Sequence, residues 1–214
     1  HPSSNPMTME LTVDPELIPA VPAPRPVEPM PNGQHVSTEM SWEEYANGIV
    51  IQGLRNRQFT QWADPPVIGG SLTHTFDSQL DFQLSTDGGA HFTSVHTPST
   101  LTIETRHVRE FQGRTTYETE VTQYDVAGGD LPLGVMIRES PTRASKGGTS
   151  SLAGGGGGGA GGGAAISSFF DIFTEVSTDG GGSWASATNG PAHEELQRIA
   201  PANTYGSNLF PQLS

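Results

Sequence analysis

Apolar and polar residues alternate along the middle of the chain, over residues 71–125. The apolar positions recur at every second residue, and threonine fills many of the positions between them. Successive side chains of an extended strand point to opposite faces, so this period of two predicts half-buried antiparallel strands. The alternating sets are Leu72, His74 and Phe76; Leu80, Phe82 and Leu84; Leu101, Ile103 and Thr105; and Tyr117, Thr119 and Val121.

Three apolar segments extend this prediction. Residues 49–51 (IVI) and 135–137 (VMI) predict short buried strands, and residues 166–176 form the most apolar and aromatic stretch, which predicts a central core strand. Brief helical turns are expected at residues 41–44 and 194–198. The predicted fold class is all-β: an antiparallel β-sandwich, jelly-roll-like, with two Asp-box hairpins and an extended proline-rich N-terminal arm.

Proline and glycine divide the chain into parts. Nine of the 17 prolines lie in the first 31 residues, which predicts an extended polyproline arm over residues 1–36. Within the arm, the alternating residues 9–13 (MELTV) are compatible with one strand. The sandwich domain is expected over residues 37–200 with a glycine-rich insertion at 154–164, and an irregular tail is expected over 201–214.

Two segments repeat one local pattern. Residues 84–92 (LSTDGGAHF) and 176–184 (VSTDGGGSW) both fit Ser-x-Asp-x-Gly-x-x-aromatic, and the second fits the Asp-box pattern Ser-x-Asp-x-Gly-x-Ser-Trp in full. In such a hairpin the carboxylate accepts backbone N–H bonds, glycine supplies a positive φ and the aromatic ring covers the turn. The predicted structural turn residues are Ser85, Asp87, Gly89, Phe92, Ser177, Asp179, Gly181 and Trp184.

Asp-boxes also occur in sialidase-type β-propellers, which keeps a sialidase-like hydrolase as a third alternative. A propeller needs at least about four blades, whereas this chain has two boxes. Arg106, Arg109 and Arg114 lie in one local run and are interpreted as a solvated strand face. Glu118 and Glu120 share a strand face and are interpreted as acidic surface, not as a catalytic pair. We therefore predict no catalytic residue and no enzyme.

The net charge and the composition limit the classes of partner and cofactor that the chain is expected to bind. The formal net charge of −13 repels phosphate backbones, which argues against nucleic-acid binding. No apolar run approaches the ~18 residues that span a bilayer, so no transmembrane segment is predicted. The absence of cysteine removes disulfides and thiolate metal sites. Four histidines lack metal-ligand spacing, and no cofactor is predicted, although oxygen ligands leave calcium possible. These histidines are His91, His96, His107 and His193.

Two longer runs carry a family resemblance. They are residues 132–142 (PLGVMIRESPT) and residues 167–177 (SSFFDIFTEVS), which lead directly into the second Asp-box. The chain resembles a family of uncharacterised secreted bacterial proteins that share the motifs VMIRESPT and SFFDIFTEVSxDGGxxW. The resemblance covers roughly residues 48–196 and departs at the glycine tract, where such relatives carry a polar hairpin. It implies an exported β protein and no catalytic residues.

These features favour a structural subunit of an extracellular or cell-surface assembly, such as a filament, tube or surface layer. The start at His1 is interpreted as a mature end left by signal-peptide removal. Subunits would form a homo-oligomer or polymer through the arm, which adds a strand to the sheet edge of a neighbour or folds back on its own domain. The main alternative is a secreted cell-surface or carbohydrate-binding module with an exposed aromatic platform at Trp42, Tyr45 or Trp62.

Overall fold

The computed structural model describes residues 33–37, 42–61, 63, 65–152 and 165–198. The described residues form twelve β-strands and no helix, and every strand pairing among them is antiparallel. The strands are β1 (Gly33–Ser37), β2 (Trp42–Glu44), β3 (Val50–Arg57), β4 (Ser71–Ser85), β5 (Thr93–Phe111), β6 (Arg114–Ala127), β7 (Met136–Glu139), β8 (Ser145–Leu152), β9 (Ala165–Ile172), β10 (Thr174–Ser177), β11 (Ala185–Ser186) and β12 (Ala192–Arg198).

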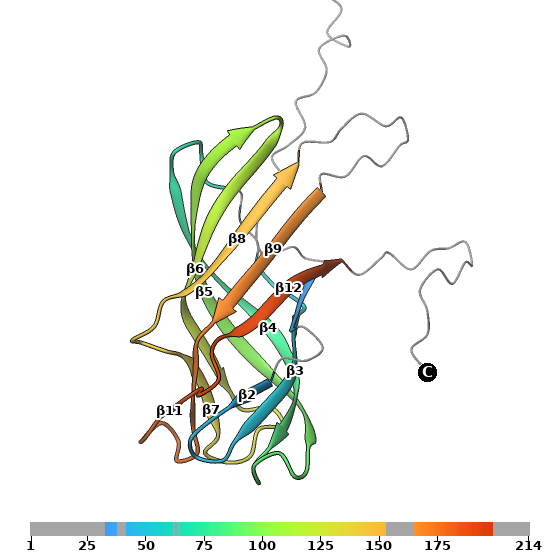
Figure 1. Cartoon of the computed structure of the whole chain (residues 1–214), viewed down its shortest axis with the longest axis vertical. Helices are drawn as coiled ribbons and strands as arrows, with labels where there is room; N and C mark the ends of the chain where they lie inside the picture. The colour runs from blue at the N-terminus through green and yellow to red at the C-terminus, as the bar shows by residue number, and fades with distance from the viewer. Residues whose placement is uncertain (1–32, 38–41, 62, 64, 153–164, 199–214) are drawn as a thin grey trace, which may run out of the picture.

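The strands form one sheet that curls until it meets itself (Figure 1). Its order is β6-β5-β4-β3-β1-β12-β9-β8, and β8 pairs back with β6. The two halves of the curled sheet enclose a single apolar core. The all-β, antiparallel, sandwich-like fold predicted from the alternating pattern is thus confirmed. From β3 to β7 each strand pairs with the next, and this up-and-down connectivity refines the jelly-roll-like expectation.

Strand β6 is the point at which the sheet divides. Residues 114–121 of β6 pair with β8, whereas residues 125–127 pair with β7. The second branch continues from β7 to β10 and β11, and a bridge between Tyr45 and Ala187 joins its far side to the end of β2. The lower part of the sheet is therefore closed by a different set of strands from the upper part.

The core follows the predicted alternation. In β4 the side chains of Phe76, Ser78, Leu80, Phe82 and Leu84 are buried, and the residues that alternate with them are exposed or half-buried. Removal of the apolar side chains from water is the main favourable contribution to folding. Leu72 and His74, nearer the start of β4, are only half-buried.

Two predicted helical turns are wrong. Residues 42–44 form β2, which pairs with β3, and residues 194–198 belong to β12, which pairs with β1. In both places an acidic residue, Glu43 or Glu194, is buried, which local helix propensity could not anticipate. The predicted single strand at 166–176 is divided at Phe173 into β9 and β10, which pair with different neighbours.

Strand β1 starts at Gly33, inside the range 1–36 expected for the arm. The remainder of the arm, including the possible strand at 9–13, lies outside the described residues, as do the insertion at 154–164 and the tail at 201–214. Among the residues that the structure describes, no helix is long and apolar enough to cross a membrane.

Candidate functional site

The segment from Ser85 to Phe92 closes as a loop after β4. The Ser85 hydroxyl donates to Asp87 Oδ1 at 2.7 Å and accepts the Gly89 N–H at 2.9 Å. Asp87 Oδ1 also accepts the backbone N–H of His91 at 3.0 Å. Gly89 has a φ of 89°, and a Cβ built on it would lie 3.9 Å from the ring of Phe92. One serine, one aspartate and one glycine therefore close the turn beneath an aromatic ring.

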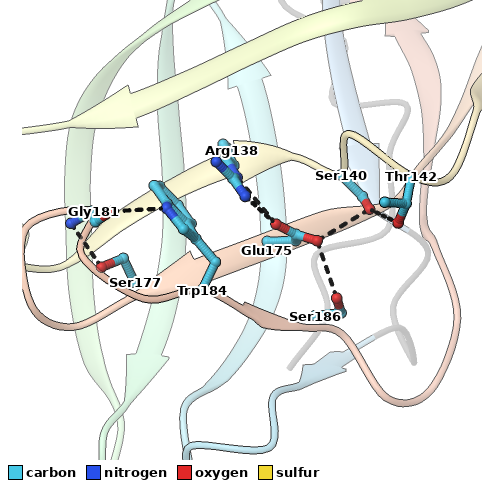
Figure 2. Close-up of polar contacts among 8 residues, drawn as sticks. All are labelled: Arg138, Ser140, Thr142, Glu175, Ser177, Gly181, Trp184 and Ser186. Carbon is cyan, nitrogen blue, oxygen red and sulfur yellow. Dashed lines mark hydrogen bonds and ion pairs between the residues drawn. The ribbon is translucent and has the colours of Figure 1, made fainter.

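The segment from Ser177 to Trp184 closes with the same bonds after β10. The Ser177 hydroxyl donates to Asp179 Oδ1 at 2.7 Å and accepts the Gly181 N–H at 2.9 Å. Asp179 Oδ1 accepts the Ser183 N–H at 2.9 Å, and Asp179 Oδ2 accepts the Ser183 hydroxyl proton at 2.7 Å. The indole N–H of Trp184 donates to the Gly181 carbonyl at 3.1 Å (Figure 2). All eight turn residues expected from the sequence therefore lie in two matching loops.

The carboxylates of Asp87 and Asp179 form their hydrogen bonds within their own loops. Hydrogen bonds from Ser85 and His91 hold the pKa of Asp87 well below its usual range. Hydrogen bonds from Ser183 and Ser177 lower the pKa of Asp179 in the same way. Carboxylates whose lone pairs already accept several bonds in their own turn have little capacity left for a metal ion or a substrate.

A partly buried ion pair joins β7 to β10. Arg138 donates to Glu175 Oε2 from both Nε, at 3.0 Å, and Nη2, at 2.7 Å (Figure 2). Glu175 Oε1 accepts the hydroxyl protons of Ser140 and Ser186 at 3.3 and 3.1 Å. The guanidinium carbon of Arg138 lies 4.1 Å from the ring centroid of Trp184. We call Arg138, Glu175 and Trp184, with these two serines, the Arg–Glu clasp.

The clasp unites the two runs that carry the family resemblance. Arg138 and Ser140 come from residues 132–142, and Glu175 comes from residues 167–177. Cross-strand pairing places Arg138 directly opposite Glu175. The sequence analysis did not predict this ion pair. An arginine and a glutamate of opposite charge in two strongly patterned strands were the available signal, but only the strand register shows that they face each other.

A second polar cluster lies inside the sheet, where its two branches separate. The carboxyl of Glu43 on β2 is 3% exposed and accepts hydroxyl protons from Tyr45, at 2.6 Å, and from Thr174 on β10, at 2.9 Å. Burial raises the pKa of Glu43 from its ordinary 4.5 to about 7. Glu43 thus ties β10, in the second branch of the sheet, to β2.

Two more buried groups share this interior. Glu194 on β12 is 2% exposed and Tyr124 on β6 is 2% exposed. Burial, together with the charges of Glu194 and Glu43, raises the pKa of Tyr124 well above its usual value. None of these groups lines the hollows over β3–β6 and β8. We interpret the cluster as an internal structural contact between strands.

The remaining candidate residues lie apart. Arg106, Arg109 and Arg114 are exposed on β5 and β6, and Arg106 forms an exposed ion pair with Glu118. Each of the four histidines has its own partner: Asp87 for His91, Asp81 for His96, the Gly69 N–H for His107 and Asp171 for His193. Within the described ranges, no group of three or more histidine or acidic side chains is placed to hold a metal ion.

The three aromatic residues expected in a binding platform do not form one in the described chain. Trp42 is 54% exposed, whereas Tyr45 is 4% exposed and points into the core cluster. Trp62 lies outside the described residues. The prediction is therefore wrong for Tyr45, because the bond to Glu43 requires its hydroxyl inside the sheet.

Comparison of the chain with protein-family models, with curated proteins and with solved structures gives no match. The resemblance to secreted bacterial proteins therefore stays a prediction.

Proposed function

We propose that this chain is a structural subunit of an extracellular assembly, in which the N-terminal arm of one copy docks on the sheet of the next. The observation that carries the proposal is a strand edge next to exposed apolar residues. Strand β4 pairs with β5 along Ser71–Leu84, but β3 covers its other side only from Gln79 onward. Among described strands, none pairs with residues 71–76 on that side.

The backbone groups along this edge have a defined direction. At Asp77 the N–H donates to Gln61 at 2.7 Å, and the carbonyl accepts the Thr60 N–H at 3.0 Å. In an antiparallel strand, every second residue presents its N–H and C=O to the same side. Thr75 and Thr73 therefore present theirs to the edge that no described strand covers. Such an edge is a template for an added strand.

Exposed apolar side chains gather at the same end of the molecule. The exposed fractions are 79% for Val67, 73% for Ile68, 45% for Val108 and 65% for Phe111. Hydrogen bonds from Gly69 to the His107 ring and from the His107 N–H to Gly70 hold the two segments together. We call these four side chains the apolar end. Exposed apolar side chains on neighbouring segments are typical of an interaction surface.

The arm is a suitable occupant of this surface. Residues 1–32 contain four acidic residues and one arginine, and residues 9–13 alternate between apolar and polar. Arg109 and Arg114, exposed beside the apolar end, supply the opposite charge on an otherwise acidic protein. A fully extended segment of this length reaches roughly 100 Å, which is enough to reach a neighbouring subunit.

Deletion of residues 1–32, which leaves β1 intact, tests the proposal. The full chain is expected to form oligomers that grow with concentration in light scattering, and the truncated chain is expected to stay monomeric with an unchanged thermal midpoint. The variant T73P should also block assembly, because proline removes an outward N–H that an added strand would use. If the truncated chain still assembles, or if the full chain is monomeric at every concentration, the proposal is wrong.

A further inference from the structure

The outer face of β5, β6, β8, β9 and β12 carries a continuous polar surface that the proposed assembly does not use. Side chains at paired positions on adjacent strands lie next to one another, so the strand register defines two neighbouring rows across this face. The first row is Arg106, Glu118, Gly148, Phe169 and Glu195, and the second row is Glu104, Glu120, Lys146, Asp171 and His193.

A hollow of about 420 Å³ lies over the β5–β6–β8 part of these rows. It is lined by Glu104, Arg106, Glu118, Thr119, Glu120, Lys146 and Gly147. In the first row, Gly148 has no side chain to fill the space between β6 and β9. Thr119 is buried, so its backbone and not its side chain contributes to the outer surface.

An exposed aromatic ring on β9 lies beside Gly148, the residue that follows Gly147 of the hollow's lining. A Cβ built on Gly148 would lie 3.2 Å from Cε1 of Phe169, so this ring packs directly beside the glycine. Phe169 remains 41% exposed, and the ring of His193 lies 5.7 Å from it at an interplanar angle of 30°. Asp171 lies 2.6 Å from His193 Nδ1 and fixes its ring. The result is a small, oriented aromatic platform on the outer face of the sheet.

Three of the five charged side chains that line the hollow are available for a ligand, whereas Arg106 and Glu118 pair with each other. Within the described part of the chain, Lys146, Glu104 and Glu120 take part in no ion pair, although opposite charges lie in neighbouring positions. Lys146 is also the only lysine of the sequence. The hollow therefore offers an ammonium donor and carboxylate acceptors side by side.

We infer that this face binds a neutral glycan, with the Phe169 ring against the apolar face of one sugar and the hollow around its hydroxyl groups. Hydroxyl groups both donate and accept, so they suit neighbouring carboxylates and an ammonium group equally. Lys146 and Arg106 would repel a polycation, and the glutamates together with the net charge of −13 would repel a polyanion. An aromatic platform with a few oriented polar groups is the usual construction of a small-ligand site.

The test uses the full chain and three neutral probes: cellohexaose, laminarihexaose and N-acetylchitohexaose, each titrated by calorimetry. At least one should bind, and F169A should weaken that binding by about tenfold, because the stacking contact is lost. K146A should weaken it as well. The matched control F111A removes an exposed phenylalanine from the apolar end and should leave glycan binding unchanged. Unchanged thermal midpoints would show that the variants are folded.

The inference is overturned if none of the three probes binds at 10 mM (~2.7 kcal/mol of binding free energy), or if F169A and F111A have equal effects. It is also overturned if hexalysine or a sulfated hexasaccharide binds at this face in place of the neutral probes. The outcome is independent of the proposed assembly, because the arm-deleted chain retains all ten residues of the two rows.

Discussion

The buried carboxyl of Glu43 makes a sharp prediction about the pH dependence of stability. Replacement of Glu43 by glutamine keeps the size and the acceptor oxygen of the side chain but removes its titration. In the wild-type protein the pKa of Glu43 is raised from 4.5 to about 7 because burial disfavours the charged form. The unfolded chain therefore loses this proton at a lower pH than the folded chain.

The sign and size follow from linkage. Below pH 4.5 Glu43 carries its proton in both the folded and the unfolded state, and its contribution to the free energy of unfolding is fully present. As the pH rises to about 7, the unfolded state is deprotonated while the folded state still holds its proton, so the free energy of unfolding falls. A difference of this size between the two pKa values corresponds to a loss of about 3 kcal/mol. Above pH 7 the loss is complete.

The assay is urea unfolding of the wild type and the E43Q variant between pH 4 and 8.5. The other titrating groups, including His193 with its raised pKa, contribute to both proteins and cancel in the difference. Relative to the wild type, the free energy of unfolding of the variant should increase by about 3 kcal/mol as the pH rises from 4.5 to 7.5. Glu44, the exposed neighbour on β2, supplies the matched control: E44Q should show no such trend.

Two results would refute this reasoning. A stability difference between E43Q and the wild type that stays constant with pH would mean that Glu43 does not titrate with a raised pKa. A difference of opposite sign would mean that the folded state stabilises the ionised form, through the hydroxyl groups of Tyr45 and Thr174. Carbon-13 chemical shifts of the glutamate side chains would identify the titrating group directly.

Two further predictions concern packing. The free energy of unfolding of the E175A variant, measured in urea, should fall by about 2–3 kcal/mol because Arg138 and two serine hydroxyls lose their partner. The control E118A, at an exposed ion pair, should lose less than about 1 kcal/mol. Equal losses in the two variants would contradict a stabilising clasp. The free energy of unfolding of G147A should fall by about 3 kcal/mol because the new Cβ would lie 2.2 Å from a backbone oxygen. The control G148A should lose much less because its neighbour is an exposed ring that can move. Equal thermal midpoints for the two variants would contradict this difference between the two glycines.

The strands in the middle of the chain could be predicted because the local alternation of apolar and polar residues indicates which side chains are buried. Leu80, Phe82 and Leu84 alternate with exposed or half-buried residues, as a strand with one buried face requires. The two loops could be predicted for a similar reason, since the hydrogen bonds of their serine and aspartate side chains are made within eight residues. Local chemistry was sufficient in both cases.

The closure of the sheet and the buried acids could not be predicted, because they depend on contacts between distant segments. The bond from Thr174 to Glu43 joins residues 131 positions apart. Burial of Glu43 in β2 also contradicts the usual exposure of glutamate, so residue type pointed away from the observed strand. The aromatic platform was expected at tryptophan and tyrosine, but the exposed ring on the polar outer face is Phe169, and the glycine that packs beside it, Gly148, lies on another strand.

The position of the Arg–Glu clasp bears on where function is to be found. The two runs that carry the resemblance supply Arg138 and Glu175, and the second loop supplies Trp184. Arg138 contacts both of the others and so joins β7, β10 and the second loop. Glu175 is 7% exposed, so the residues of the clasp are occupied in holding the fold together. Any protein with both runs would be expected to share this clasp, whatever it binds. Differences in ligand or partner should instead follow residues outside the clasp, such as Lys146 and the residues of the apolar end.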